Sequence, residues 1–211
     1  MEASAVLWGL GAVPIGWAST LAARRLAGSL RPSLVLMIGA QAAVAVSALL
    51  LAPAPAIPPM LVAGWALGLL AVVDVLAFRL PDVVTLPLIL AGLILGDRIT
   101  GLPFADRLAG AAAGYAALSL LGWAYARLRG QEGLGLGDAK LLAVAGAWLG
   151  WAVLPAVVLT ACAAGLVWVA IRLLLHGRSS LSEPVAFGAP LCGAIWALML
   201  IAVGTPWPGT V

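Results

Sequence analysis

The scarcity of charged side chains constrains this chain more than any other feature of its sequence. Of 211 residues, eleven are Lys or Arg and eight are Asp or Glu, which is 9% of the chain, whereas 64% are hydrophobic. Soluble domains carry about 25% charged residues. The composition therefore excludes a soluble enzyme, a nucleic-acid-binding protein and a disordered chain, and it predicts a polytopic membrane protein.

Apolar runs between charges and Pro or Gly breaks predict where the helices lie. A bilayer core about 30 Å thick needs about 20 apolar residues per helix. We predict an all-α integral membrane bundle of about eight transmembrane helices, at 4–23, 34–53, 59–79, 83–96, 107–127, 139–152, 153–175 and 187–204. The longest polar connection, 176–184, has nine residues, so we expect a single transmembrane domain over 1–211.

The basic residues predict how the bundle is oriented. Cytoplasmic loops of membrane proteins carry an excess of Lys and Arg. Only Arg98 and Arg107 fall on one side of the predicted membrane, each next to an Asp. The other nine fall on the opposite side: Arg24, Arg25, Arg31, Arg79, Arg127, Arg129, Lys140, Arg172 and Arg178. We therefore expect both chain ends on the non-cytoplasmic side.

One acidic residue, Asp74, falls inside a predicted helix. It comes seven residues before Pro81, which we expect to end the helix, so Asp74 is predicted to lie about 10 Å inside the span. A carboxylate at that depth costs roughly 2.5–3.5 kcal/mol, so it should face the bundle interior and have a partner. A salt bridge to Arg79 is one interpretation, but Arg79 points about 140° away around the helix. We favour a functional role.

A second acid follows a glycine-rich segment. Gly133, Gly135 and Gly137 alternate ahead of Asp138, which opens the sixth apolar run. Asp is also a favoured helix N-cap, so capping is the competing interpretation. The orientation, which rests on basic residues alone, brings Asp138 to the same face and depth as Asp74. The two acids are therefore predicted to form a pair.

Paired carboxylates suit one chemistry in particular. Two like charges at short range share one proton, so the ionised carboxylate activates water while the protonated one donates to a carbonyl oxygen. This is aspartic peptide hydrolysis, which needs no metal or other cofactor. Because the pair titrates as a unit, neither Asp is assigned as the base.

The segments around both aspartates resemble the type IV prepilin peptidases, the intramembrane G-x-G-D aspartic endopeptidases of type IV pilus and protein-secretion systems. The matching stretches are RLPDVVTLP (79–87), EGLGLGDAKLL (132–142), GAWLG (146–150) and VAFGAPL (185–191). By that resemblance Asp74 and Asp138 are the catalytic pair, in a multi-pass protein of the bacterial inner membrane. The substrate would be a prepilin-like or pseudopilin-like protein, whose short basic leader is removed at the cytoplasmic face.

The resemblance also implies further site residues and two departures. We expect substrate-binding or site-shaping roles for Glu132, Gly135, Gly137, Lys140, Phe187 and Gly188. Bifunctional members carry a cytoplasmic domain with two CxxC pairs, associated with zinc and with N-methylation. Residues 24–33 hold no cysteine here, so neither zinc nor N-methyltransferase activity is implied. Asp82 stands where the family often has Asn, and we expect it to be solvated.

Two alternatives remain to be compared with this hypothesis. Presenilin-type proteases also use G-x-G-D, but they have Tyr beside the first Asp, where this chain has Val73, and a Pro-Ala-Leu element that its sequence lacks. A channel or proton-coupled transporter would use Asp74 as its ion or proton site. Such transporters often have two matching halves, and this sequence shows no internal repeat. The expected partners are the lipid bilayer and a protein substrate, without nucleic acid, and nothing in the sequence indicates an oligomeric state.

Overall fold

The structure, a computed structural model, describes residues 18–19, 21–22, 34–130, 135–176 and 186–204. All regular elements in these ranges are helical. The α-helices are α2 (Leu34–Leu51), α3 (Ile57–Ala77), α4 (Asp82–Leu95), α5 (Asp97–Thr100), α6 (Phe104–Arg129), α7 (Leu136–Leu149), α8 (Leu154–His176) and α9 (Gly188–Gly204). Two short 3-10 turns, Ala54–Ala56 and Trp151–Val153, precede α3 and α8.

Seven of the predicted helices are confirmed as helices, with shifted ends. The first prediction, 4–23, lies almost entirely outside the described residues. Helix α7 begins three residues earlier than predicted, and the one-turn helix α5 was not predicted. Helix α6 ends at Arg129, and the next residue, Gly130, takes the left-handed conformation (φ 67°) that glycine commonly adopts after a helix.

Within the part of the chain that the structure describes, three helical stretches are long and apolar enough to cross a membrane, namely Ala54–Ala77, Phe104–Arg129 and Trp151–Leu175. Shorter apolar helices lie at Met37–Leu51, Asp82–Leu95 and Gly188–Val203. Large apolar side chains also cover the outside of the bundle, among them Leu128 at 84% and Leu174 at 85% exposure. Extensive apolar surface marks contact with a membrane or with another protein, so this surface agrees with an integral membrane bundle.

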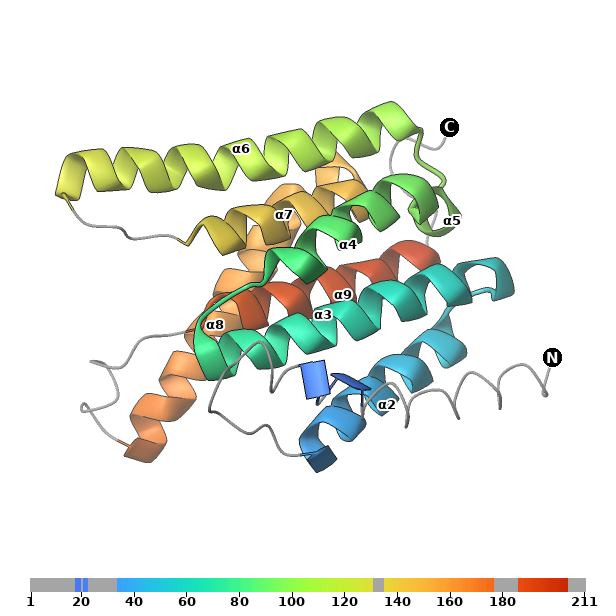
Figure 1. Cartoon of the computed structure of the whole chain (residues 1–211), viewed down its shortest axis with the longest axis horizontal. Helices are drawn as coiled ribbons and strands as arrows, with labels where there is room; N and C mark the ends of the chain where they lie inside the picture. The colour runs from blue at the N-terminus through green and yellow to red at the C-terminus, as the bar shows by residue number, and fades with distance from the viewer. Residues whose placement is uncertain (1–17, 20, 23–33, 131–134, 177–185, 205–211) are drawn as a thin grey trace.

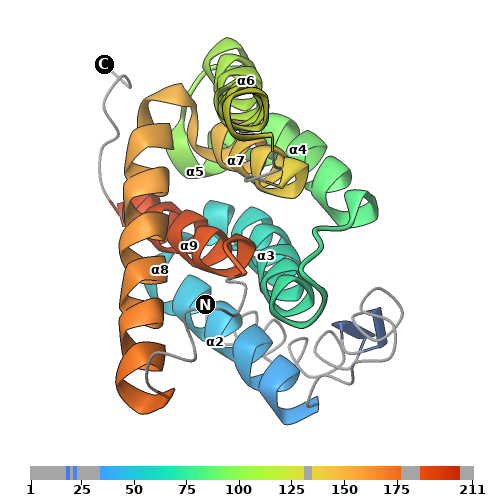
Figure 2. The ribbon, with the colours of Figure 1, turned by 90° about the vertical axis from the view of Figure 1, so that its left-hand side faces the viewer.

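Helix α7 is the most buried of the described helices, with ten of its fourteen residues buried. It packs mainly against α6 and α4, while α9 packs against α3 and α8 (Figures 1 and 2). Glycines let α6 and α7 approach closely, since a Cβ on Gly110 would stand 2.7 Å from the carbonyl oxygen of Gly146. Small residues serve this purpose in membrane helix packing, where the backbones themselves come into contact.

One basic residue, Arg107, is buried in the structure. Asp106 is its neighbour in the sequence, but its acidic partner in the structure is Asp97, at 3.8 Å. Its guanidinium also donates to the carbonyl oxygens of Leu93 and Leu102, at 3.1 Å each. Arg107 therefore satisfies backbone acceptors around the end of α4, where a helix leaves carbonyl groups without partners.

Several chain segments meet at one end of the bundle, on the left in Figure 1 and facing the viewer in Figure 2. They are the end of α3, the start of α4, the end of α6 and the starts of α7 and α9. Asp74 lies near the end of α3 and Asp138 near the start of α7. The fold therefore brings both aspartates to this end.

Candidate active site

Asp74 lies in the last turn of α3, nearer the helix end than the sequence predicted. The helix ends at Ala77, because Phe78 turns the backbone into the left-handed region (φ 50°, ψ 39°) ahead of Pro81. Asp74 is thus three residues, or about 4.5 Å, from the helix end. The expected helix end at Pro81 is wrong, because the backbone already leaves the helix at Phe78. The residue is only 6% exposed.

The carboxylate of Asp74 is held by the first turn of α9. The backbone N–H of Ala189 donates to Oδ2 of Asp74 at 2.9 Å. N–H groups in the first turn of a helix have no partner within the helix, so a carboxylate is a favourable acceptor there. This contact leaves no room for a side chain at Gly188, where a Cβ would stand 2.7 Å from Oδ2 of Asp74.

Asp138 lies in the first turn of α7 and does not cap the helix. Gly135 is the N-cap residue, and no side chain bonds to the backbone at that position. The backbone N–H of Asp138 donates to the carbonyl oxygen of Gly135 at 3.0 Å. The capping interpretation of Asp138 is therefore wrong, which leaves its partly buried carboxylate available for other contacts.

Both aspartates line one cavity of about 570 Å³ between the end of α3, the turn that follows it and the start of α7. The two carboxylates are close enough to interact electrostatically. The lining residues are Val73, Asp74, Phe78, Arg79, Leu80, Pro81, Asp82, Gly135, Gly137, Asp138 and Lys140. Pockets of about 300–1,000 Å³ hold a small ligand or a short peptide segment.

An ion pair crosses the edge of this cavity. Nζ of Lys140, in α7, lies 2.5 Å from Oδ1 of Asp82, the first residue of α4. The side chain of Asp82 is about half exposed, as expected of a solvated acid, but it is also engaged by Lys140. Sequence reasoning missed the pair because 58 residues separate its members.

Only some of the other predicted site residues lie at the aspartate cavity. Gly135, Gly137 and Lys140 line the cavity, and Gly188 contacts Asp74 from α9. Phe187 packs against the hydrophobic core and does not line the cavity. Glu132 lies outside the described residues. No sequence signal pointed to Ala189, because its contribution is a backbone N–H.

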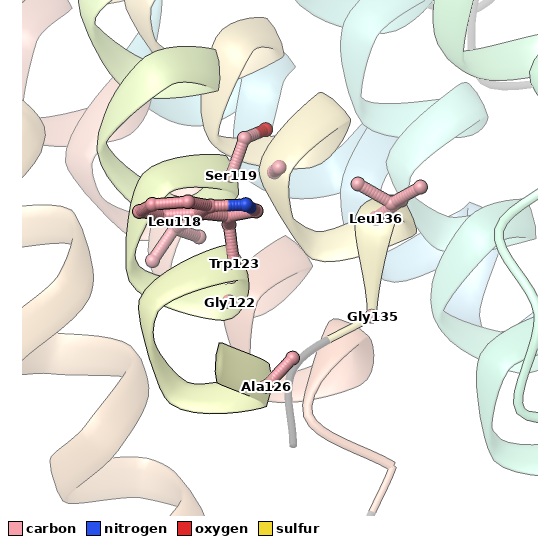
Figure 3. A pocket seen from close by; sticks show the side chains of 8 residues that line it. Leu118, Ser119, Gly122, Trp123, Ala126, Gly135 and Leu136 are labelled. Atoms are coloured by element: carbon pink, nitrogen blue, oxygen red, sulfur yellow. The ribbon is translucent and has the colours of Figure 1, made fainter. Parts of the chain in front are cut away.

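A separate cavity of about 340 Å³ lies between α6 and α7 (Figure 3). Leu118, Ser119 and Trp123 reach it from α6, and Leu136 from α7. It shares Gly135 with the aspartate cavity, but none of its lining residues is acidic or basic. The candidate for chemistry is therefore the aspartate cavity.

Within the described ranges, the carboxylate pair is the candidate group for chemistry at this cavity. Within those ranges no group of three or more His, Cys, Asp or Glu residues is arranged to hold a metal ion. Cys192 is buried and Cys162 is exposed, and both are free thiols. Two carboxylates that face one cavity can share a proton and act together on a water molecule and a carbonyl group. An all-helical bundle with such a pair in one cavity has the arrangement of a candidate aspartic peptidase.

Comparison with known proteins assigns the family. The model of the type IV leader peptidase family matches residues 61–170, which include both aspartates, and the chain belongs to this family. A prepilin leader peptidase/N-methyltransferase from Dickeya chrysanthemi is 46% identical over 119 residues, covering 56% of this chain and 42% of the relative. A protein of the same name from Aeromonas hydrophila is 40% identical over 172 residues, covering 82% and 59%.

The chain spans about half the length of the curated relatives it matches. No solved structure matches it. The relatives named above are peptidases, so these comparisons give no support to the alternative of a channel or transporter.

Proposed function

We propose that this chain is an intramembrane aspartic endopeptidase that removes the short basic leader from prepilin-like or pseudopilin-like proteins. The observation that carries the proposal is the single cavity lined by Asp74 and Asp138, which come from separate helices. The family assignment supports the same activity, because it joins this chain to the leader peptidases.

In this proposal one carboxylate acts as the general base of the hydrolysis and the other as the general acid. The ionised carboxylate takes a proton from water as the water attacks the scissile carbonyl carbon, while the protonated carboxylate donates to the carbonyl oxygen. The N–H of Ala189 orients Asp74 for either role. Gly135 and Gly137 leave the edge of the cavity without side chains, so an extended peptide backbone has space to approach.

We propose further that residues 1–211 form one multi-pass domain of the bacterial inner membrane, with about eight transmembrane helices and the aspartate cavity at the cytoplasmic side. Arg79, Arg127, Arg129, Lys140 and Arg172 all lie at or near helix ends on the aspartate side of the bundle. Since Lys and Arg mark the cytoplasmic face, this distribution supports a cytoplasmic site. It also supports the prediction that both chain ends are on the non-cytoplasmic side.

The proposal covers peptide cleavage and not N-methylation. The relatives carry both activities in their name. In this chain Cys162 and Cys192 are the two cysteines, and residues 24–33 hold none. The sequence features that the resemblance links to methylation are therefore absent between the first two predicted helices.

The direct test is to incubate the purified protein with a candidate prepilin in detergent and to identify the product by mass spectrometry. We expect a new N-terminus directly before the substrate's apolar segment, without an added methyl group. Asp74→Asn and Asp138→Asn should each abolish cleavage while the protein still inserts and folds. Substantial cleavage by either variant refutes the pair. Ion or solute uptake by liposomes that contain the protein, unaffected by Asp138→Asn, would instead favour a transporter.

A further inference from the structure

Another cavity, which we call the α8–α9 cavity, adjoins the first turn of α9. It has a volume of about 390 Å³ and lies between α3, α8 and α9. Its lining residues are mostly apolar: Val75, Phe78, Ala164, Trp168, Arg172, Ala186, Ala189 and Pro190. The described part of the cavity thus combines two aromatic rings with small and branched apolar side chains, a surface that favours an apolar guest.

Two residues connect this cavity to the aspartates. Phe78 lines both the aspartate cavity and the α8–α9 cavity. Ala189 lines the α8–α9 cavity while its backbone N–H donates to Oδ2 of Asp74 at 2.9 Å. A peptide whose scissile bond is held at Asp74 and Asp138 therefore has its neighbouring side chains within reach of the α8–α9 cavity.

Phe78 occupies this junction in an unfavourable backbone conformation. Among the described residues it is the one non-glycine residue with a positive φ, 50°. Glycine or asparagine forms such a helix end at less cost. Its N–H donates to the carbonyl oxygen of Asp74 at 2.8 Å, and the residue is 53% exposed. Strained backbone positions cluster at functional sites, and this one puts an aromatic ring at the boundary between two cavities.

We propose that the cavity between α3, α8 and α9 is a specificity subsite, which takes an apolar side chain of the substrate next to the cleaved bond. Phe78 forms the wall between this subsite and the aspartates. The proposal rests on the proposed peptidase function and adds to it the determinant of side-chain preference. The aspartates position the bond, and the subsite selects which residue stands beside it.

The experiment uses one substrate in versions that carry Ala, Leu, Phe or Trp on either side of the bond that the wild-type enzyme cleaves. Ala164→Trp fills the subsite from α8, because Ala164 lines it and is exposed. Ala163→Trp is the matched control, since Ala163 is the exposed preceding residue and does not line the cavity. Neither position touches the aspartate cavity.

We expect Ala164→Trp to lower kcat/KM at least about tenfold for the substrates with Leu, Phe or Trp at one position, and less than about twofold for Ala there. Ala163→Trp should leave kcat/KM unchanged for every substrate. Trp168→Ala enlarges the same cavity from α8 and should shift the preference the other way, toward the largest side chain. Two variants with opposite expected effects keep the test independent of the folding of either one.

The outcomes separate the subsite from the function on which it rests. If the wild-type enzyme cleaves none of the substrates, the peptidase function fails. If the wild-type enzyme cleaves them, and Ala164→Trp and Trp168→Ala each change the rates for all the substrates by one common factor or change none, the subsite is wrong. That second result would mean that the cavity holds lipid or supports the fold.

Discussion

The carboxylate of Asp74, in the last turn of α3, accepts a hydrogen bond from the backbone N–H of Ala189, in the first turn of α9. One candidate catalytic group is thus fixed by a helix end that lies 115 residues further along the chain. The same contact gives α9 an acceptor for an N–H group that has no partner inside the helix. Asp74 therefore has a structural role that can be separated from its proposed chemical role.

Replacing Asp74 by Asn and by Ala should separate these two roles. Asn keeps an oxygen that accepts from Ala189, whereas Ala leaves the N–H unpaired. We expect Asp74→Ala to lower the free energy of unfolding by about 1–3 kcal/mol and Asp74→Asn by less than about 1 kcal/mol. Both variants should be inactive. Thermal unfolding in detergent and a cleavage assay measure the two effects, and equal stability of the variants would contradict the capping role.

Gly188→Ala should damage the site without changing any group that takes part in the chemistry. A Cβ there would stand 2.7 Å from Oδ2 and 2.8 Å from Cγ of Asp74, so the carboxylate or the start of α9 must move. Displacements of about 1 Å can lower a rate roughly 100-fold, and we expect a loss of that order in kcat.

Gly193→Ala provides the control on the same helix, because its Cβ would meet no atom within 4 Å in the part of the chain that the structure describes. We expect this variant to cleave at the wild-type rate. An active Gly188→Ala enzyme would show that Asp74 does not depend on the close approach of α9.

The sequence predicted that Asp74 and Asp138 form a pair, because charges are so few that each can be assigned, and both line one cavity of the structure. Basic residues oriented the chain, and the same orientation brought Asp74 and Asp138 to one face. The existence of seven helices was predictable for a related reason: long apolar runs interrupted by glycine, proline and charge indicate where each helix lies, although not where it ends.

The packing of the site was not predictable. The contact between Asp74 and Ala189 depends on how α3 meets α9, and a backbone N–H has no signature in the sequence. The end of α3 was misplaced because the left-handed position is expected to hold Gly or Asn, whereas here it holds Phe78. The ion pair of Asp82 was not predicted because its partner Lys140 lies 58 residues further along the sequence, in a different helix.

The ion pair between Asp82 and Lys140 should position the start of α4 against α7. Partly exposed pairs contribute only about 0.2–1 kcal/mol to stability, so we expect the main effect on activity. Asp82→Lys and Lys140→Asp each place like charges together across the cavity edge, and each should lower kcat/KM on the order of tenfold.

The double variant Asp82→Lys/Lys140→Asp should recover part of that loss, because it restores the pair with its charges exchanged. Recovery should be incomplete, since the lysine introduced at position 82 would stand in the first turn of α4, where a helix disfavours positive charge. Steady-state cleavage rates of the two single variants and the double variant give the coupling between the sites. Additive losses would mean that the pair does not position the site.

The glycine contact between α6 and α7 should decide whether Asp138 has a rigid support. Gly146→Ala would force a side chain against the backbone of Gly110, and overpacking of this kind costs about 1–3 kcal/mol. Gly39→Ala in α2 is the control, because its Cβ would meet no atom of the described residues within 4 Å and alanine is the better helix former. We therefore expect a lower unfolding temperature for Gly146→Ala and an unchanged or higher one for Gly39→Ala. Equal unfolding temperatures would show that the two helices can separate without loss of stability.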